Sequence, residues 1–377
     1  MEVETSQWTT VAPEDWNSWR WQLRNRITTL AALERCVHLT VDEREAIDSA
    51  GQLFRMAITP YYARLIESDN PNCPIRKQAI PSMAELRLSP GEMEDPLDEE
   101  GHLIAPGLTH RYPDRALLYT NHNCAMYCRF CTRKRKVSDP SSSTSRSDLE
   151  EALAAIRETP AIQDVIISGG DALSLSTERL AYILEELARI PHVSIARIGT
   201  RNLVTLPQRV DESLCAMLRS VQTRQLAVYV MTHFNHVKEC TDDAWSACEA
   251  IADSGTPIQN QMVLLRGVND TPDAVISLNR QLLRMRVKPY YILQADLAEG
   301  IGHFRTPIET GLAIMKALRG HVSGLAVPQY VVDLPGGAGK VPLVPEYRQP
   351  MNGSGTVFQN YQGRTVVYPG CMEAGTG

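Results

Sequence analysis

The sequence predicts an α/β fold in which parallel strands alternate with helices on the outside. Short apolar runs of strand length follow one another from residue 116 onward. Between these runs lie longer amphipathic segments that begin with recognisable helix-start signals. Repeated β–α units of this kind form either a barrel or an open doubly wound sheet.

Seven apolar runs are the strand candidates. All are short and flanked by polar or turn-forming residues, as strands are, and none approaches the ~18 apolar residues that span a bilayer. They are Ala116–Asn121, Asp164–Ser168, Val193–Ile198, Leu226–Thr232, Ile258–Leu265 and Pro289–Gln294, with Gln329–Asp333 as a further candidate.

Helix signals separate these runs. Thr177–Ile190 places its leucines and isoleucines on one face, as an outer helix requires. Ser147–Glu150 and Thr306–Glu309 fit capping boxes, and Thr271–Pro272 opens another helix. No internal sequence repeat is visible.

The segment before the strands predicts a helical layer. Apolar residues recur at helical spacing in Glu14–Glu34 and Val41–Met56, whereas Pro71–Pro106 is rich in proline, glycine and acidic residues and is typical of a connector. The predicted organisation has three parts. They are an N-terminal helical accessory region with its connector (1–105), the β–α repeats (106–335), and a lysine-bearing loop with a C-terminal extension (336–377).

Composition and charge exclude several classes of protein. The formal net charge of −6 gives no global positive field for nucleic acid. Met1 to Val11 contain neither a basic nor an apolar run, so we predict no secretory signal and a cytoplasmic protein away from membranes. The nine cysteines are an odd number, and three of them crowd together, which is not typical of a disulfide framework.

Those three cysteines, Cys124, Cys128 and Cys131, directly follow the first predicted strand with the spacing C-x₃-C-x₂-C. A [4Fe–4S] cube normally takes four thiolates. Three ligands on one loop would leave one iron open to a small molecule, and the next cysteine is distant Cys215. A structural zinc site and a closed ferredoxin-type carrier are the alternatives, but both favour a fourth nearby ligand.

Ser168-Gly169-Gly170-Asp171 follows the second predicted strand. Glycines there let backbone approach a ligand, although such a pair is also typical of a plain turn. With the cysteine spacing and Phe130, this segment resembles the radical SAM superfamily over about residues 116–335. The resemblance implies a partial (β/α)6-type radical SAM barrel, with S-adenosylmethionine (SAM) at the open iron. The implied SAM contacts are Ser168, Gly169, Gly170, Asp171, His233 and Gln261.

Lys340 lies in a glycine-rich loop, Asp333 to Val341. The loop fails the phosphate-loop pattern, which needs Ser or Thr where Val341 stands. A lysine on such a loop can form an imine with a carbonyl cofactor such as pyridoxal phosphate (PLP), and a surface lysine is the alternative.

A set of motifs in order resembles the lysine 2,3-aminomutase family over about residues 14–371. They are residues 106–115, the cysteine loop, 197–201, 233–236, 260–261, 267–270, 303–307 and 335–340. By position, the resemblance implies that Lys340 forms the imine with PLP. It also implies that Arg111 and Arg115 clamp the phosphate with their planar donors, and that Tyr112 lies against the pyridine ring.

The same resemblance places the substrate. Arg133 would hold its α-carboxylate, and Asp296 and Asp333 would hold a side-chain cation. This acidic pair favours L-lysine over glutamate as the substrate of a 2,3-aminomutase, with arginine 2,3-aminomutase as the near alternative. A non-catalytic iron–sulfur or zinc-stabilised binding protein is the alternative from a different class.

Partners and zinc follow from the resemblance as well. It implies a reductase, flavodoxin or ferredoxin as electron donor and a homo-oligomer, either a dimer or a tetramer. The best-known family members bind zinc between subunits through a cysteine in the Gly-Val-Asn-Asp region and a cluster of cysteines near the C-terminus. Here Thr271 stands in place of the first, and only Cys371 remains of the cluster. We therefore predict no intersubunit zinc.

Overall fold

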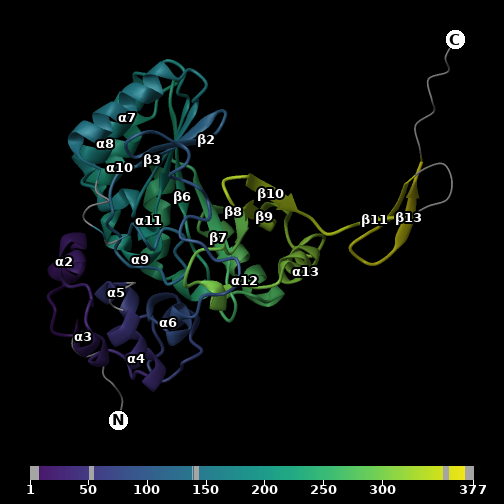
Figure 1. The fold of residues 1–377 in the computed structure, drawn as a ribbon, viewed down its shortest axis with the longest axis horizontal. Helices are drawn as coiled ribbons and strands as arrows, with labels where there is room; N and C mark the ends of the chain where they lie inside the picture. The colour runs from purple at the N-terminus through teal and green to yellow at the C-terminus, as the bar shows by residue number, and fades with distance from the viewer. Residues whose placement is uncertain (1–7, 51–54, 138, 140–143, 351–355, 370–377) are drawn as a thin grey trace.

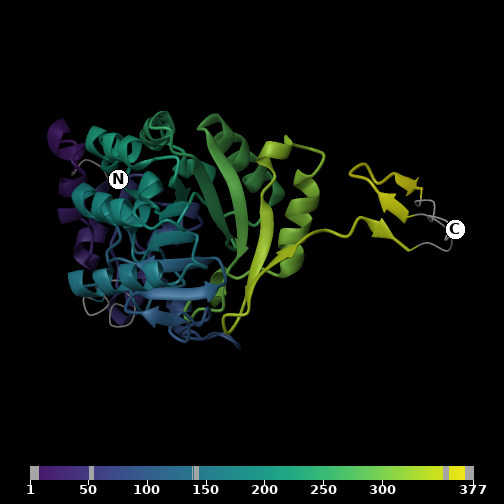
Figure 2. The same cartoon turned by 90° about the horizontal axis from the view of Figure 1, so that it is seen from above.

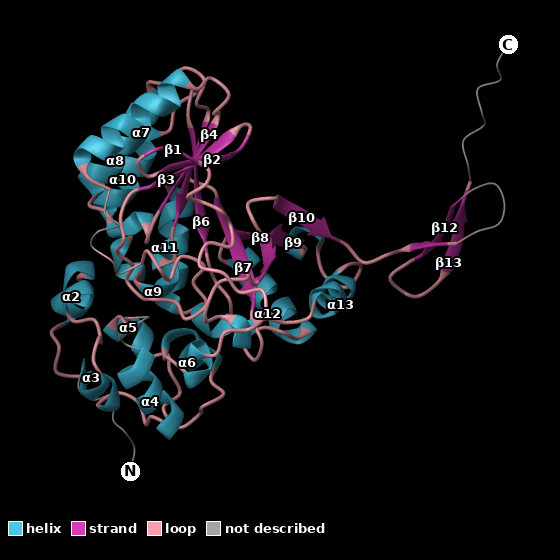
Figure 3. Cartoon of the chain, viewed as in Figure 1, coloured by secondary structure: helices cyan, strands magenta, loops and turns pink. Residues whose placement is uncertain are grey.

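The computed structural model describes residues 8–50, 55–137, 139, 144–350 and 356–369. A curved ten-stranded sheet forms the centre, helices cover its outer side, and a cluster of short helices lies at one end (Figures 1 and 2). A separate three-stranded sheet projects from the opposite end. Figure 3 shows how helices and strands are distributed between these parts.

The ten strands are arranged in chain order, from β1 to β10. The first three are antiparallel, β3 to β9 are parallel, and β10 returns antiparallel to β9. The strands are β1 (Leu103–Ala105), β2 (Leu108–Tyr112), β3 (Arg115–Tyr119), β4 (Asp164–Ser168), β5 (Ile195–Gly199), β6 (Ala227–Thr232), β7 (Ile258–Leu264), β8 (Val287–Gln294), β9 (Gln329–Leu334) and β10 (Gly339–Leu343). The predicted partial barrel is therefore confirmed, with β9 as a seventh parallel strand.

Helices between the parallel strands cover the outer face (Figure 2). They are α7 (Arg146–Glu158), α8 (Thr177–Ala188), α9 (Asn202–Thr205), α10 (Glu212–Val221), α11 (Asp242–Asp253), α12 (Pro272–Arg284) and α13 (Ile308–Leu318). Each long helix buries one apolar stripe, for example Leu180, Ile183, Leu184 and Leu187 of α8.

Two of the predicted helix starts are wrong. The capping box of α7 is formed by Ser145 and Asp148, two residues before the predicted one: the Ser145 side chain accepts from Asp148 N, and the Asp148 side chain accepts from Ser145 N. Helix α13 begins after Pro307 with no side-chain cap, and the Thr306 hydroxyl has no hydrogen-bond partner among the described residues. Thr271 caps α12 as predicted.

The N-terminal layer is helical but more broken than predicted. It contains α1 (Pro13–Trp16), α2 (Trp19–Arg24), α3 (Leu30–Glu34), α4 (Val41–Ala50), α5 (Pro60–Ala63) and α6 (Pro74–Ala79). Ser18 and Thr29 cap new helices inside the stretch predicted as one. Ile27, Leu33 and Tyr62 of this layer belong to the same apolar core as the barrel strands, so the layer packs directly on the barrel.

The C-terminal sheet consists of β11 (Arg348–Gln349), β12 (Thr356–Gln359) and β13 (Thr365–Tyr368), all antiparallel. It stands apart from the barrel (Figures 1 and 2). In the described part of the chain, no helix is long and apolar enough to cross a membrane.

Candidate active site

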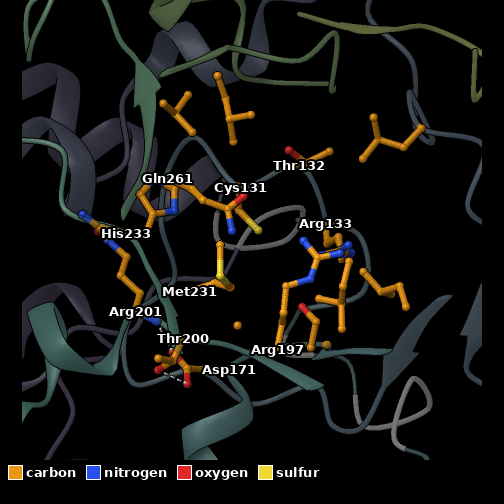
Figure 4. A pocket seen from close by; sticks show the side chains of 18 of the residues that line it. Cys131, Thr132, Arg133, Asp171, Arg197, Thr200, Arg201, Met231, His233 and Gln261 are labelled. Carbon is orange, nitrogen blue, oxygen red and sulfur yellow. Dashed lines mark hydrogen bonds between the residues drawn. The ribbon is translucent and has the colours of Figure 1, made fainter. Parts of the chain in front are cut away.

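One cavity of about 520 Å³ opens where the parallel strands end at their carboxyl termini. Its size suits a cofactor and a small substrate. All the site residues predicted from the sequence line this cavity, namely Arg111, Tyr112, Arg115, Cys124, Cys128, Cys131, Arg133, Ser168, Gly169, Gly170, Asp171, His233, Gln261, Asp296, Asp333 and Lys340. Figure 4 shows part of this lining. The fold thus brings together residues that are more than 200 positions apart.

The cysteine loop follows β3 and is fastened to the N-terminal layer. Arg129 lies between the second and third cysteines. Its Nη2 forms an ion pair with Glu85 Oε2 (2.6 Å), and both side chains are fully buried. Three further hydrogen bonds hold the loop, from Tyr127 N to Ala57 O (2.9 Å), from Arg129 N to Gln78 O (3.0 Å) and from Arg26 Nη1 to Cys124 O (2.6 Å). Sequence reasoning missed these partners because no local pattern marks them.

The three thiols line the cavity from one loop, but among the described residues no group of three His, Cys, Asp or Glu side chains is arranged to hold a single metal ion. Their role as cluster ligands therefore stays a prediction. Burial, with the nearby Asp171 carboxylate, raises the pKa of the Cys124 thiol well above its ordinary value. Burial and Cys128 raise the pKa of the Cys131 thiol to about 11. The Cys124 and Cys131 thiols therefore keep their protons at neutral pH, and a metal centre would replace those protons when it binds.

Close packing explains why Gly169 and Gly170 are glycines. Gly169 has a φ of +125°, and a Cβ atom added at Gly170 would lie 2.3 Å from Asn123 O. Their loop donates hydrogen bonds from Gly170 N to Asn121 O (2.5 Å) and from Asp171 N to Asn123 O (2.8 Å). These glycines hold the entrance of the cysteine loop, a reason that the sequence did not reveal.

Asp171 joins this loop to the end of β5. Its carboxylate accepts hydrogen bonds from Thr200 Oγ1 (2.7 Å) and Arg201 N (2.6 Å), the first of which is drawn in Figure 4. Burial raises its pKa to about 6. The side chain thus fixes the backbone, and its role as a SAM contact stays a prediction.

His233, which directly follows β6, and Gln261, in the middle of β7, both line the cavity (Figure 4). The His233 ring packs against Phe130 with centroids 5.3 Å apart. Burial and the Arg201 charge lower the pKa of His233 to about 3, so the ring is neutral. Its buried Nε2 has no hydrogen-bond partner among the described residues, which fits a ligand that supplies one.

Lys340 lines the cavity, but it lies on strand β10 and not in a loop as predicted, because residues 339–343 pair with β9. Antiparallel pairing with β9 places it opposite Asp333, and Lys340 Nζ lies 2.6 Å from Asp333 Oδ2. Arg111 Nη2 binds the other oxygen of Asp333 (3.1 Å). The Tyr112 hydroxyl accepts a hydrogen bond from Lys340 N (2.9 Å), and the Arg115 guanidinium stacks 3.8 Å from the Tyr112 ring centroid. The four predicted PLP residues are therefore neighbours.

The predicted substrate residues lie in the same cavity. Asp296 follows β8, accepts a hydrogen bond from Thr132 Oγ1 (2.5 Å), and has its pKa raised to about 6, mainly by burial and also by Asp333. Arg133 forms a bidentate ion pair with Glu99, with Nη2 2.6 Å from Oε1. Glu99 and Thr132 were missed, because neither lies in a recognisable motif.

Comparisons with known proteins identify the family. Residues 118–278 match the model of the radical SAM superfamily, and residues 315–375 match that of lysine-2,3-aminomutase. An L-lysine 2,3-aminomutase from Acetoanaerobium sticklandii is 46% identical over 95% of this chain and 86% of its own length. The chain belongs to the lysine 2,3-aminomutase family. The L-lysine 2,3-aminomutase of Clostridium subterminale is also 46% identical, over 96% of this chain and 88% of its own.

Membership of the lysine 2,3-aminomutase family makes the chain an isomerase of the radical SAM superfamily, which uses a [4Fe–4S] cluster and SAM. This confirms the predicted enzyme class over a non-catalytic binding protein. A glutamate 2,3-aminomutase from Clostridioides difficile is also similar, 42% identical over 94% of this chain and 82% of its own length. The family therefore leaves the amino acid to be decided by the site. Cys371 lies outside the described residues, so the predicted lack of zinc stays a prediction.

Proposed function

We propose that this chain is a PLP-dependent 2,3-aminomutase that moves the α-amino group of a basic L-amino acid to the β-carbon. L-Lysine is the proposed substrate. The observation that carries this is the pair of carboxylates, Asp296 and Asp333, in one cavity with Lys340. Asp296 forms no ion pair among the described residues, and an unpaired buried charge is costly, so a bound cation would stabilise it. Asp333 already pairs with Lys340 and Arg111 and would add a second carboxylate beside that cation.

The residues around Lys340 fit PLP. Lys340 offers an amine at the cavity wall, Tyr112 offers an aromatic face, and Arg111 and Arg115 offer guanidinium donors suited to a phosphate. When bound, PLP supplies an electron-delocalising ring through which an amino nitrogen can pass between adjacent carbons. Lys340 Nζ must lose a proton before it can bond to carbon, and Asp333 Oδ2 is placed to take it.

In the same cavity, Cys124, Cys128 and Cys131 would hold the cluster, and His233 Nε2, which has no partner among the described residues, would contact SAM. Arg133 would receive the α-carboxylate while Glu99 fixes two of its nitrogens. Together these contacts would orient the substrate, and correct orientation can supply much of a rate enhancement.

Arginine is the second candidate, because both carboxylates also accept hydrogen bonds from a guanidinium. The L-lysine 2,3-aminomutases among the relatives support lysine first. The electron donor, the homo-oligomeric state and the cytoplasmic location remain predictions from the sequence.

Product analysis tests the proposal. Enzyme reconstituted anaerobically with iron, sulfide and PLP would receive lysine, arginine, glutamate or alanine together with SAM and dithionite. We expect β-lysine as the main product. Preference for glutamate or alanine would refute the cation pocket, whereas preference for arginine would keep the pocket and change the substrate.

A further inference from the structure

Arg201 is a cavity residue to which no role has been given so far. It follows β5 and lies 73 positions after Cys128, yet its Nη1 donates a hydrogen bond to Cys128 Sγ (2.9 Å). The guanidinium also lies 5.1 Å from the ring centroid of Phe130, which directly precedes Cys131. A permanent cation therefore touches a sulfur that the sequence assigns to the cluster.

This arginine is held rigidly. Its side chain is 8% exposed, and Nη2 pairs with Glu239 Oε1 (2.7 Å), whose side chain is fully buried. The same Nη2 donates to Gln78 Oε1 (2.7 Å), and Nε donates to His233 O (3.2 Å). Because Nη2 and Nε bond to these other groups, the Nη1 atom is the one directed at the Cys128 sulfur.

The N-terminal layer builds this arrangement. Gln78 of α6 also accepts from Asn235 Nδ2 (2.9 Å), and Tyr62 of α5 donates to Glu239 Oε1 (2.8 Å). Gln78 O meanwhile receives the hydrogen bond from Arg129 N in the cysteine loop. One helix of the layer therefore fixes the arginine and the loop relative to each other.

We infer that Arg201 is a positioning residue that eases one-electron reduction of the cluster through its charge and its N–H···S hydrogen bond to Cys128. Hydrogen bonds and charges at cluster sulfurs set the reduction potential. Reduction adds one negative charge, supplied by a low-potential one-electron donor, and a fixed cation at a ligand sulfur stabilises that added charge. The inference rests on the proposed cluster ligands and is independent of the amino-acid substrate.

The test is an EPR-monitored redox titration of cluster-loaded enzyme without SAM, so that any effect on SAM binding is excluded. Arg201→Gln alone would leave Glu239 buried without its cation, so the main variant is the double substitution Arg201→Gln/Glu239→Gln. We expect its cluster to be about tenfold harder to reduce, equal to a potential about 59 mV lower. Arg201→Lys keeps a cation but loses the planar fork of donors. Its cluster potential should lie between those of the unmodified enzyme and the double variant.

The matched control is Arg76→Gln/Glu43→Gln. This pair is also buried (2.6 Å), but the other partners of Arg76 are the carbonyls of Ser68 and His38, within the N-terminal layer. Its cluster should titrate like that of the unmodified enzyme.

Three results would overturn the inference. The first is an unchanged potential in the Arg201 variants with four irons per chain. The second is an equal shift in the control, and the third is failure of both Arg201 variants, but not the control, to take up iron, which would make the arginine purely structural. Absence of a cluster in the unmodified enzyme would instead refute the cysteine assignment itself.

Discussion

The ionised Asp296 carboxylate is expected to destabilise the ligand-free fold and to strengthen binding of a cationic substrate. Its pKa is raised from an ordinary 3.8 to about 6, mainly by burial, with Asp333 adding to the effect and Thr132 opposing it. A carboxyl whose pKa is higher in the folded than in the unfolded state destabilises the fold once it ionises. The penalty is absent below pH 3.8, grows as the pH rises, and is complete above about pH 6.

At 1.36 kcal/mol per pH unit, the shift is worth at most about 3 kcal/mol, and less because Asp296 is only partly buried. Asp296→Asn removes the charge and keeps an oxygen that can accept from Thr132. The ligand-free variant should therefore melt a few degrees higher than the unmodified protein at pH 8, with the difference vanishing near pH 4.

The same substitution should weaken substrate binding. Removing one partner of a buried charge pair typically costs about 2–5 kcal/mol, so KM for lysine should rise about 30-fold or more. In the unmodified enzyme, KM should also rise as the pH falls below about 6, because Asp296 then becomes neutral. Thermal denaturation of the ligand-free protein and initial rates across pH would measure both effects.

Asp333→Asn provides the contrast. Asp333 pairs with both Lys340 and Arg111, so its loss should raise KM and lower the melting temperature. A ligand-free Asp296→Asn protein that melts lower than the unmodified protein at pH 8 would refute the reasoning, and so would an unchanged KM.

Three further substitutions test other parts of the site. Cys128→Ala removes one of three proposed thiolates, so reconstituted enzyme should lack its brown colour and SAM cleavage; four bound irons would contradict this. Lys340→Ala should abolish the adduct that borohydride forms with bound PLP, and an adduct mapped to another lysine would end that assignment. Gly170→Ala places a Cβ 2.3 Å from Asn123 O and should cost about 1–3 kcal/mol with loss of cluster iron, whereas Gly324→Ala, with nothing within 4 Å, should not.

Local patterns in the sequence were sufficient for much of the fold. The alternation of short apolar runs and amphipathic helices predicted all seven parallel strands. A strand buried on both faces is a short continuous apolar run, whereas a helix buried along one stripe has apolar residues every three or four positions, so the two patterns differ. The cluster of three cysteines could also be predicted from the sequence, because they lie on one loop and no long-range contact is needed to bring them together. Helix starts were predicted less well, because Ser145–Asp148 and Ser147–Glu150 both place an acidic residue three positions after a serine, and only the first pair forms the capping box.

Only the tertiary structure decided which distant side chains meet. Glu99 and Arg133 are 34 positions apart, and Arg201 and Cys128 are 73 apart; nothing in either segment names its partner. Such pairs depend on strand order and on the packing of the N-terminal layer, whose free energy is summed over many contacts. The need for glycine at position 170 is a further example. It became visible only in the structure, where the backbone of Asn123 lies against Gly170 and leaves no room for a Cβ atom.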